Sequence, residues 1–162
     1  MSDFRAVLCT VESDSHMWNL VYLQLLLEEN GGDVVNLGAC TPVRDVVEKV
    51  RSGRPDLLVL SSVNGHGAHG ARVLRAALQA ASGAAVPSVA GGKLTTAESD
   101  NDRVRRELLA AGWTDVFTGD DAVPRFVRFL DAGKARGFDR WHAPEAVVAP
   151  WDDVPLVGTE VR

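Results

Sequence analysis

Residues 56–61 read Asp56-Leu57-Leu58-Val59-Leu60-Ser61, and the four side chains at the centre of this run are all apolar. A strand with one face in water alternates apolar and polar side chains, whereas a strand covered on both faces does not. The run therefore predicts a central strand of a parallel sheet with helices on both faces.

On either side of this run, the chain alternates between short apolar segments and longer segments with helical signals. Thr41-Pro42 places an N-cap threonine before a proline suited to the first helical turn, and Asn30-Gly31-Gly32 is typical of a helix end. The sequence predicts strands at 6–11, 33–37, 56–61, 86–90 and 115–118, and helices at 20–29, 42–51, 71–81, 101–111 and 123–130.

Five successive strand–helix units predict an α/β fold, namely a flavodoxin-like, doubly wound, five-stranded parallel sheet in the order 2-1-3-4-5. In this order the first, third and fourth strands are neighbours. Their carboxyl ends meet in one cleft, which is where such sheets bind ligands. We expect residues 1–132 to form this domain. Residues 133–162, which contain Trp141, Trp151 and several prolines, are expected to form an irregular C-terminal tail that lies over a surface or docks a partner.

Composition excludes several classes of function. A length of 162 residues with 46% apolar residues suits one domain with its own core. The net charge of −5 and the scattered Lys and Arg disfavour a nucleic-acid partner. The chain has no apolar run of roughly 18 residues and no signal-peptide pattern, so we expect no membrane association and a cytoplasmic location. Cys9 and Cys40 have no paired spacing and are expected to be reduced.

Three short stretches follow the strands that this topology brings together. They are Asp14-Ser15-His16, Ser61-Ser62-Val63 and Gly91-Gly92. A carboxylate two residues before a histidine can hold one ring nitrogen, which fixes the tautomer and makes the other nitrogen a better metal ligand. Taken alone, each stretch is also compatible with a polar loop or an ordinary strand-to-helix turn.

Together the three stretches resemble the cobalamin-binding signature Asp-x-His-x-x-Gly, Ser-x-Leu and Gly-Gly, with matching intervals between the pieces. The resemblance covers roughly residues 5–130 and includes Val34-Val35-Asn36-Leu37-Gly38 and the stretch from Ser61 to Gly67. In these features the chain is similar to the small, cobalamin-binding subunits of adenosylcobalamin-dependent glutamate mutase (methylaspartate mutase).

The resemblance implies adenosylcobalamin as the cofactor and His16 as the lower axial cobalt ligand, replacing the cofactor's own dimethylbenzimidazole. It also implies that Asp14 hydrogen-bonds the far imidazole nitrogen and that Ser61 hydrogen-bonds a nitrogen of the displaced base. Gly91 and Gly92 would let the base and its ribose pass close to the backbone. The residues implied to contact the cofactor are Asp14, Ser15, His16, Met17, Ser61, Val63, Gly65, Gly91, Gly92 and Thr118.

Two positions depart from the signature. Val63 replaces its leucine and keeps an apolar wall, whereas Asn19 replaces its final glycine. Asn19 has two interpretations, because an asparagine here can cap the first helix or can intrude on the slot for the nucleotide tail. His66 and His69 are compatible with a metal site, although the resemblance favours a glycine-rich loop that borders the corrin ring and the subunit interface.

Aromatic and leucine side chains of the first helix form another group of candidates. Trp18, Tyr22, Leu20, Leu23 and Leu27 lie at helical spacing, and we interpret them as helix packing rather than as a cofactor site.

The resemblance implies an isomerase subunit that carries cobalamin for the interconversion of glutamate and 3-methylaspartate by adenosyl-radical chemistry. The substrate would lie on a separate, large, barrel-type subunit. This chain would hold no catalytic residue and would be inactive alone. The implied assembly is a heterotetramer that contains a homodimer.

Three alternatives remain open: a corrinoid carrier for methyl transfer, a subunit of a mutase for another substrate, and a fold that has lost cobalamin. A signalling receiver shares the topology, but it needs an aspartate where this chain has Ser61-Ser62.

Overall fold

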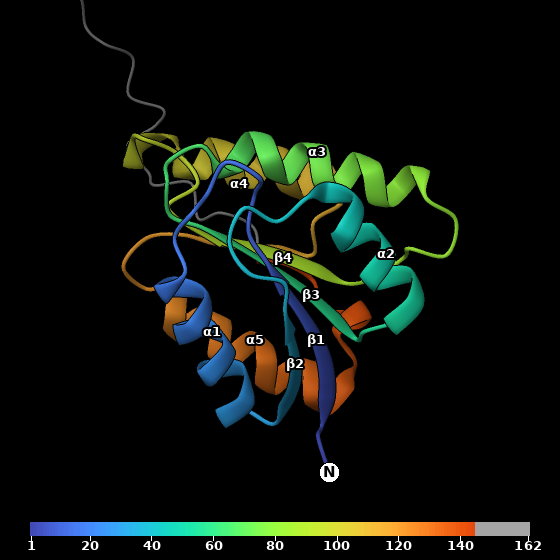
Figure 1. Cartoon of the computed structure of the whole chain (residues 1–162). Coiled ribbons are helices and arrows are strands. Elements are labelled where there is room, and N and C mark those ends of the chain that lie inside the picture. The colour runs from blue at the N-terminus through green and yellow to red at the C-terminus, as the bar shows by residue number, and fades with distance from the viewer. Residues whose placement is uncertain (145–162) are drawn as a thin grey trace, which may run out of the picture.

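The computed structural model describes residues 1–144, and its strands form one parallel sheet in the order β2-β1-β3-β4-β5 (Figure 1). The strands are β1 (Phe4–Cys9), β2 (Gly32–Asn36), β3 (Leu57–Ser62), β4 (Ser88–Gly92) and β5 (Asp115–Phe117). The helices are α1 (Trp18–Glu29), α2 (Val43–Gly53), α3 (Gly67–Ala80), α4 (Asn101–Ala110) and α5 (Ala122–Arg136), with short 3-10 turns η1 (Glu98–Asp100) and η2 (Phe138–Arg140). The predicted α/β fold and strand order are both confirmed.

β3 lies at the centre of the sheet. All of its residues are buried, and it pairs in parallel with β1 on one side and β4 on the other. Leu58 and Leu60 pack in the core layer under α2, α3 and α4, whereas Leu57 and Val59 pack in the layer under α1 and α5. Figure 1 shows these two helix layers on opposite faces of the sheet. Both faces of β3 are covered, which explains why its run contains no alternating polar position.

α1 carries apolar side chains on its exposed side as well as on the side that is buried. Leu20 and Leu27 are buried, as predicted. Trp18 and Tyr22 are 84% and 53% exposed, so the prediction that they pack within the domain is wrong. At about 100° per residue, positions 18 and 22 lie on the side of the helix that faces away from positions 20 and 27.

No helix within residues 1–144 has the length and apolar content needed to cross a membrane.

The C-terminal part of the domain extends further than the sequence indicates. α5 was expected to end at residue 130 but continues to Arg136, so the expected domain boundary after residue 132 falls inside this helix. Phe138 follows the helix and packs against Phe4 and Phe129, with ring centroids 5.2 and 5.4 Å apart. Gly133 makes this possible, because a Cβ atom there would collide with the Phe138 ring. Trp151 and the prolines after residue 144 lie outside the described residues.

Candidate functional site

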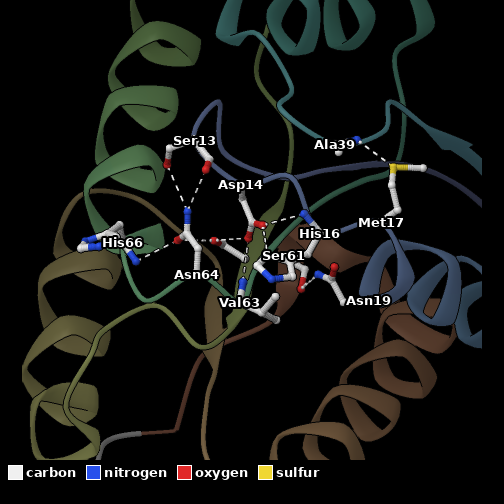
Figure 2. Close-up of polar contacts among 11 residues, drawn as sticks. Ser13, Asp14, His16, Met17, Asn19, Ala39, Ser61, Val63, Asn64 and His66 are labelled. Atoms are coloured by element: carbon white, nitrogen blue, oxygen red, sulfur yellow. Dashed lines mark hydrogen bonds and ion pairs between the residues drawn. The ribbon is translucent and has the colours of Figure 1, made fainter.

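Asp14 is fully buried in the loop between β1 and α1, at the carboxyl edge of the sheet (Figure 2). Its Oδ1 accepts the backbone N–H of His16 at 3.0 Å and contacts the His16 ring nitrogen Nδ1 at 2.7 Å. Its Oδ2 accepts the Ser62 hydroxyl at 2.7 Å and the Val63 N–H at 2.8 Å. One carboxylate therefore ties the loop after β1 to the end of β3, and the predicted contact between Asp14 and His16 is confirmed.

The charge state of Asp14 follows from these contacts. Burial by itself raises the pKa of a carboxyl group. Here the hydrogen bonds from the His16 and Val63 backbone, the Ser62 hydroxyl and the His16 ring outweigh burial and hold the pKa of Asp14 well below its ordinary value. Asp14 is therefore a carboxylate near neutral pH.

A carboxylate can only accept hydrogen bonds, so the hydrogen of its contact with His16 lies on Nδ1. In the neutral ring, Nε2 then keeps a free lone pair. The His16 side chain is 58% exposed, so this lone pair is accessible from outside the domain. The arrangement suits a metal-ligating imidazole that is oriented by a carboxylate.

Two residues of this network were not among the expected site residues. Ser62 is fully buried, and its hydroxyl also contacts Asn64 Oδ1 at 3.2 Å. Asn64 in turn donates from Nδ2 to the backbone oxygen and hydroxyl of Ser13, at 3.2 Å each. These contacts join the loops after β1 and β3. The sequence signal was a second serine at the end of an otherwise apolar strand.

An apolar cavity of about 200 Å³ opens beside this network, between the carboxyl edge of the sheet and helices α1 and α5. It is lined by Asn19, Tyr22, Leu23, Val59, Leu60, Ser61, Val63, Val89, Ala90, Gly91, Gly92, Phe117, Ala122, Val123 and Phe126. Val63 belongs to both the hydrogen-bond network and the cavity wall. Its N–H donates a hydrogen bond to Asp14, and the residue lines the cavity. A cavity of about 150 Å³ can hold benzene, so this one can admit a flat aromatic group.

Gly91 and Gly92 line the cavity, and the close approach of the neighbouring strands also requires glycine at both positions. A Cβ atom on Gly91 would lie 2.7 Å from the Phe117 carbonyl oxygen. Gly92 has a φ of +93°, and a Cβ atom there would collide with the Ser62 carbonyl oxygen. Larger residues would therefore push apart the strands that form this edge of the cavity.

Asn19 does not cap α1, so that interpretation is wrong. It lies in the first turn of the helix after Trp18, and Met17 occupies the N-cap position without a side-chain hydrogen bond. The Asn19 side chain lines the cavity instead, and its Nδ2 donates to Ser61 Oγ at 3.3 Å.

Four expected residues lie around the edge of the sheet but do not line the cavity. Ser15 is exposed in the loop before α1, and Met17 accepts the Ala39 N–H through Sδ at 3.3 Å. Gly65 is buried with a φ of +83°. Thr118 is buried just after β5, where its carbonyl oxygen accepts a hydrogen bond from Arg125.

Two other histidines, which the sequence analysis considered as metal ligands, lie on the other face of the sheet. His66 and His69 are exposed beside a separate cavity of about 450 Å³ near the starts of α2 and α3. Within residues 1–144, no group of three or more His, Cys, Asp or Glu side chains is placed to hold a metal ion.

Residues 4–126 match the model of the B12 binding domain. The sequence is 32% identical over 125 residues to the glutamate mutase sigma subunit of Halobacterium salinarum, an alignment that covers 75% of this chain and 83% of the relative.

Two solved structures also match, and this chain spans little more than half of each. One is a cobalamin-binding protein from Desulfitobacterium hafniense, with a TM-score of 0.63, 26% identity, and coverage of 79% of this chain and 57% of that one. The other is the methanol:cobalamin methyltransferase complex of Methanosarcina barkeri, with a TM-score of 0.63 and 20% identity. This match covers 88% of the present chain and 53% of the matched chain. The second match shows the fold alone. The family resemblance predicted from the sequence is confirmed, and the chain belongs to the B12-binding domain family.

Proposed function

We propose that this chain is the cobalamin-carrying subunit of a carbon-skeleton mutase, with adenosylcobalamin bound through His16. The observation that carries the proposal is the exposed His16 imidazole, whose Nδ1 is held by a buried, ionised Asp14 next to an apolar cavity. The family match and the glutamate mutase sigma subunits among its relatives support this assignment.

The residues present fit the cofactor. Cobalt takes imidazole nitrogen as a ligand, and the tautomer that Asp14 imposes leaves Nε2 free for this purpose. The cavity next to the network has the size and the apolar walls that a displaced, flat benzimidazole needs. When bound, adenosylcobalamin supplies radical chemistry that protein side chains cannot.

The chain's own residues hold and orient the cofactor. His16 would ligate the metal, and Asp14 would fix the direction and tautomer of its ring. Ser61 would hydrogen-bond the displaced base, and Val63, Gly91 and Gly92, which line the cavity, would form walls of its slot. The outer residues Ser15, Met17, Gly65 and Thr118 would contact the parts of the cofactor that extend beyond the cavity.

The substrate pair is glutamate and 3-methylaspartate, held by a separate barrel-type large subunit. The names of the relatives support this substrate. No described residue that lines the apolar cavity is charged, so this cavity is not suited to a dicarboxylic amino acid. With the substrate on the other subunit, the chain would be inactive alone and would gain activity in a complex.

Reconstitution tests this proposal. A glutamate mutase large subunit that binds the chain is mixed with it and adenosylcobalamin, and formation of 3-methylaspartate from glutamate is measured. We expect turnover with the wild type and with His142→Gln, a control that is exposed and lies beside residues 85–87, at the opposite edge of the sheet, and none with His16→Gln. A bound complex that does not convert glutamate but converts another carbon-skeleton substrate would refute the substrate. Methyl transfer without rearrangement would refute the mutase assignment.

A further inference from the structure

The outward side of α1 carries a stripe of exposed side chains, formed by Trp18, Tyr22, Leu25 and Glu29. The three apolar residues are 84%, 53% and 55% exposed, so no part of residues 1–144 covers them. The four positions are spaced i, i+4, i+7 and i+11, which places them on one side of an α-helix. α1 lies beside α5 on one face of the sheet (Figure 1). A contiguous apolar stripe that a domain leaves exposed marks an interaction surface.

The charges of α1 run against the dipole of the helix. An α-helix is partly positive at its N-terminus, where acidic groups stabilise it, and partly negative at its C-terminus. The first turn of α1 has no acidic residue, and Met17 at the N-cap position makes no side-chain hydrogen bond. The last turn carries the exposed Glu28 and Glu29 and no basic residue. α1 therefore has a positive end without an anion and two acids at its negative end.

A second copy of α1 that runs in the opposite direction removes both mismatches. Antiparallel pairing about the middle of the stripe, between Tyr22 and Leu25, places Glu29 of each copy beside the N-terminus of the other. The apolar side chains meet between these ends. Parallel pairing would instead place Glu29 opposite Glu29. The stripe is thus complementary to itself, which is what an interface with two-fold symmetry requires.

We propose that this chain forms a homodimer in which α1 packs antiparallel against α1 of a second copy. Since a whole aromatic side chain buries about 150–250 Å², the stripe offers on the order of 400 Å² in each copy. With the flanking Val21 and Gln24, two copies reach roughly the 1,000 Å² at which specific interfaces begin. The dimer is therefore weak, with a dissociation constant in the micromolar range. It does not depend on the proposed cofactor or reaction.

Sedimentation velocity of the full-length chain without cofactor, over roughly 1–500 µM, tests the proposal. We expect the wild type to change from monomer to dimer within this range. Leu25→Arg brings two like charges together at the centre of the interface and should weaken the dimer at least about tenfold. Val73→Arg is the matched control, because Val73 is 43% exposed on α3, on the other face of the sheet, and should keep the wild-type dissociation constant.

Two results would overturn the proposal. One is a wild type that remains monomeric at the highest concentration, which would mean that another segment or another protein covers the stripe. The other is a Leu25→Arg variant that associates as tightly as the wild type, which would place the dimer contact elsewhere.

Glu29→Lys separates a role in the interface from a role in the fold. A lysine in the last turn suits the dipole of its own helix, so the melting temperature of the dilute, monomeric chain should stay equal or rise. In the dimer the same lysine faces the positive N-terminus of the other copy, so association should weaken severalfold. Unchanged association would overturn the antiparallel arrangement. Because cobalamin is absent from these measurements, either outcome leaves the assignment of His16 unaffected.

Discussion

Asp14 is the residue on which the site depends, because it accepts hydrogen bonds from two loops. Replacing it with alanine leaves the Ser62 hydroxyl and the N–H groups of His16 and Val63 without their acceptor. Each such loss costs about 1–3 kcal/mol. We predict that Asp14→Ala lowers the free energy of unfolding by about 3 kcal/mol or more in urea titration. Asp120→Ala, an exposed control, should change it by less than about 0.5 kcal/mol. If Asp14→Ala and Asp120→Ala lowered the free energy of unfolding equally, that result would contradict the hydrogen-bond network around Asp14.

The lowered pKa of Asp14 also predicts a pH dependence. Above the unfolded-state pKa of about 3.9, the carboxylate is ionised in both states and its stabilisation is complete. As the pH falls through the lower folded-state pKa, this stabilisation is lost. We expect the difference in unfolding free energy between wild type and Asp14→Asn to be largest above about pH 5 and to narrow below about pH 4. A difference that stays unchanged into acid would be inconsistent with a depressed pKa.

The contact between Asp14 and His16 could be predicted because the two residues are close in sequence. Ser62 and Asn64 were missed because their partners lie about fifty residues away, and only the register between β1 and β3 brings them together. Asn19 was ambiguous for the same reason. A helix cap is decided locally, but the bond from Asn19 to Ser61 depends on how α1 docks on the sheet.

At the level of elements, the start of α2 shows a similar limit of prediction from the sequence. The sequence predicts Thr41 as the N-cap. In the structure the Thr41 hydroxyl donates to the Gly38 carbonyl oxygen, and Glu12 from the loop after β1 accepts the Val43 N–H at 2.9 Å. The position of the helix was predicted correctly to within one or two residues. The cap was wrong because a side chain distant in sequence supplies the acceptor.

The packing of η2 on α5 predicts that a larger residue at Gly133 destabilises the domain. A Cβ atom on Gly133 would collide with the Phe138 ring, so Gly133→Ala forces that ring out of its site and should lower the free energy of unfolding by about 1–3 kcal/mol. Gly53 at the end of α2 is a matched control, because a Cβ atom there would have only ordinary contacts. Gly53→Ala should be neutral or stabilising by up to about 1 kcal/mol in the same measurement. If Gly133→Ala were equally neutral, the contact with Phe138 would be refuted.

For the whole molecule, the folded domain continues past the predicted boundary. Trp141 packs on Phe129 at a centroid distance of 5.1 Å and donates to Asp115 at 2.8 Å, and Asp115 also pairs with the buried Arg105. We predict that a chain ending at residue 132 melts about 10 °C or more below a chain ending at residue 144, because it lacks the packing of Phe138 and Trp141. Equal melting temperatures would show that this segment adds nothing to the core. The boundary could not be predicted because the segment has no periodic pattern.

The axial ligand of cobalt tests the assignment of this molecule most directly. The electron paramagnetic resonance spectrum of cob(II)alamin bound to the chain is recorded with natural histidine and with nitrogen-15 histidine. If His16 is the ligand, the axial nitrogen splitting changes from a triplet to a doublet, and His16→Ala abolishes the change while His69→Ala keeps it. A triplet that persists with labelled histidine would mean that the benzimidazole stays on cobalt. In that case the Asp14–His16 pair would not be a cobalt site.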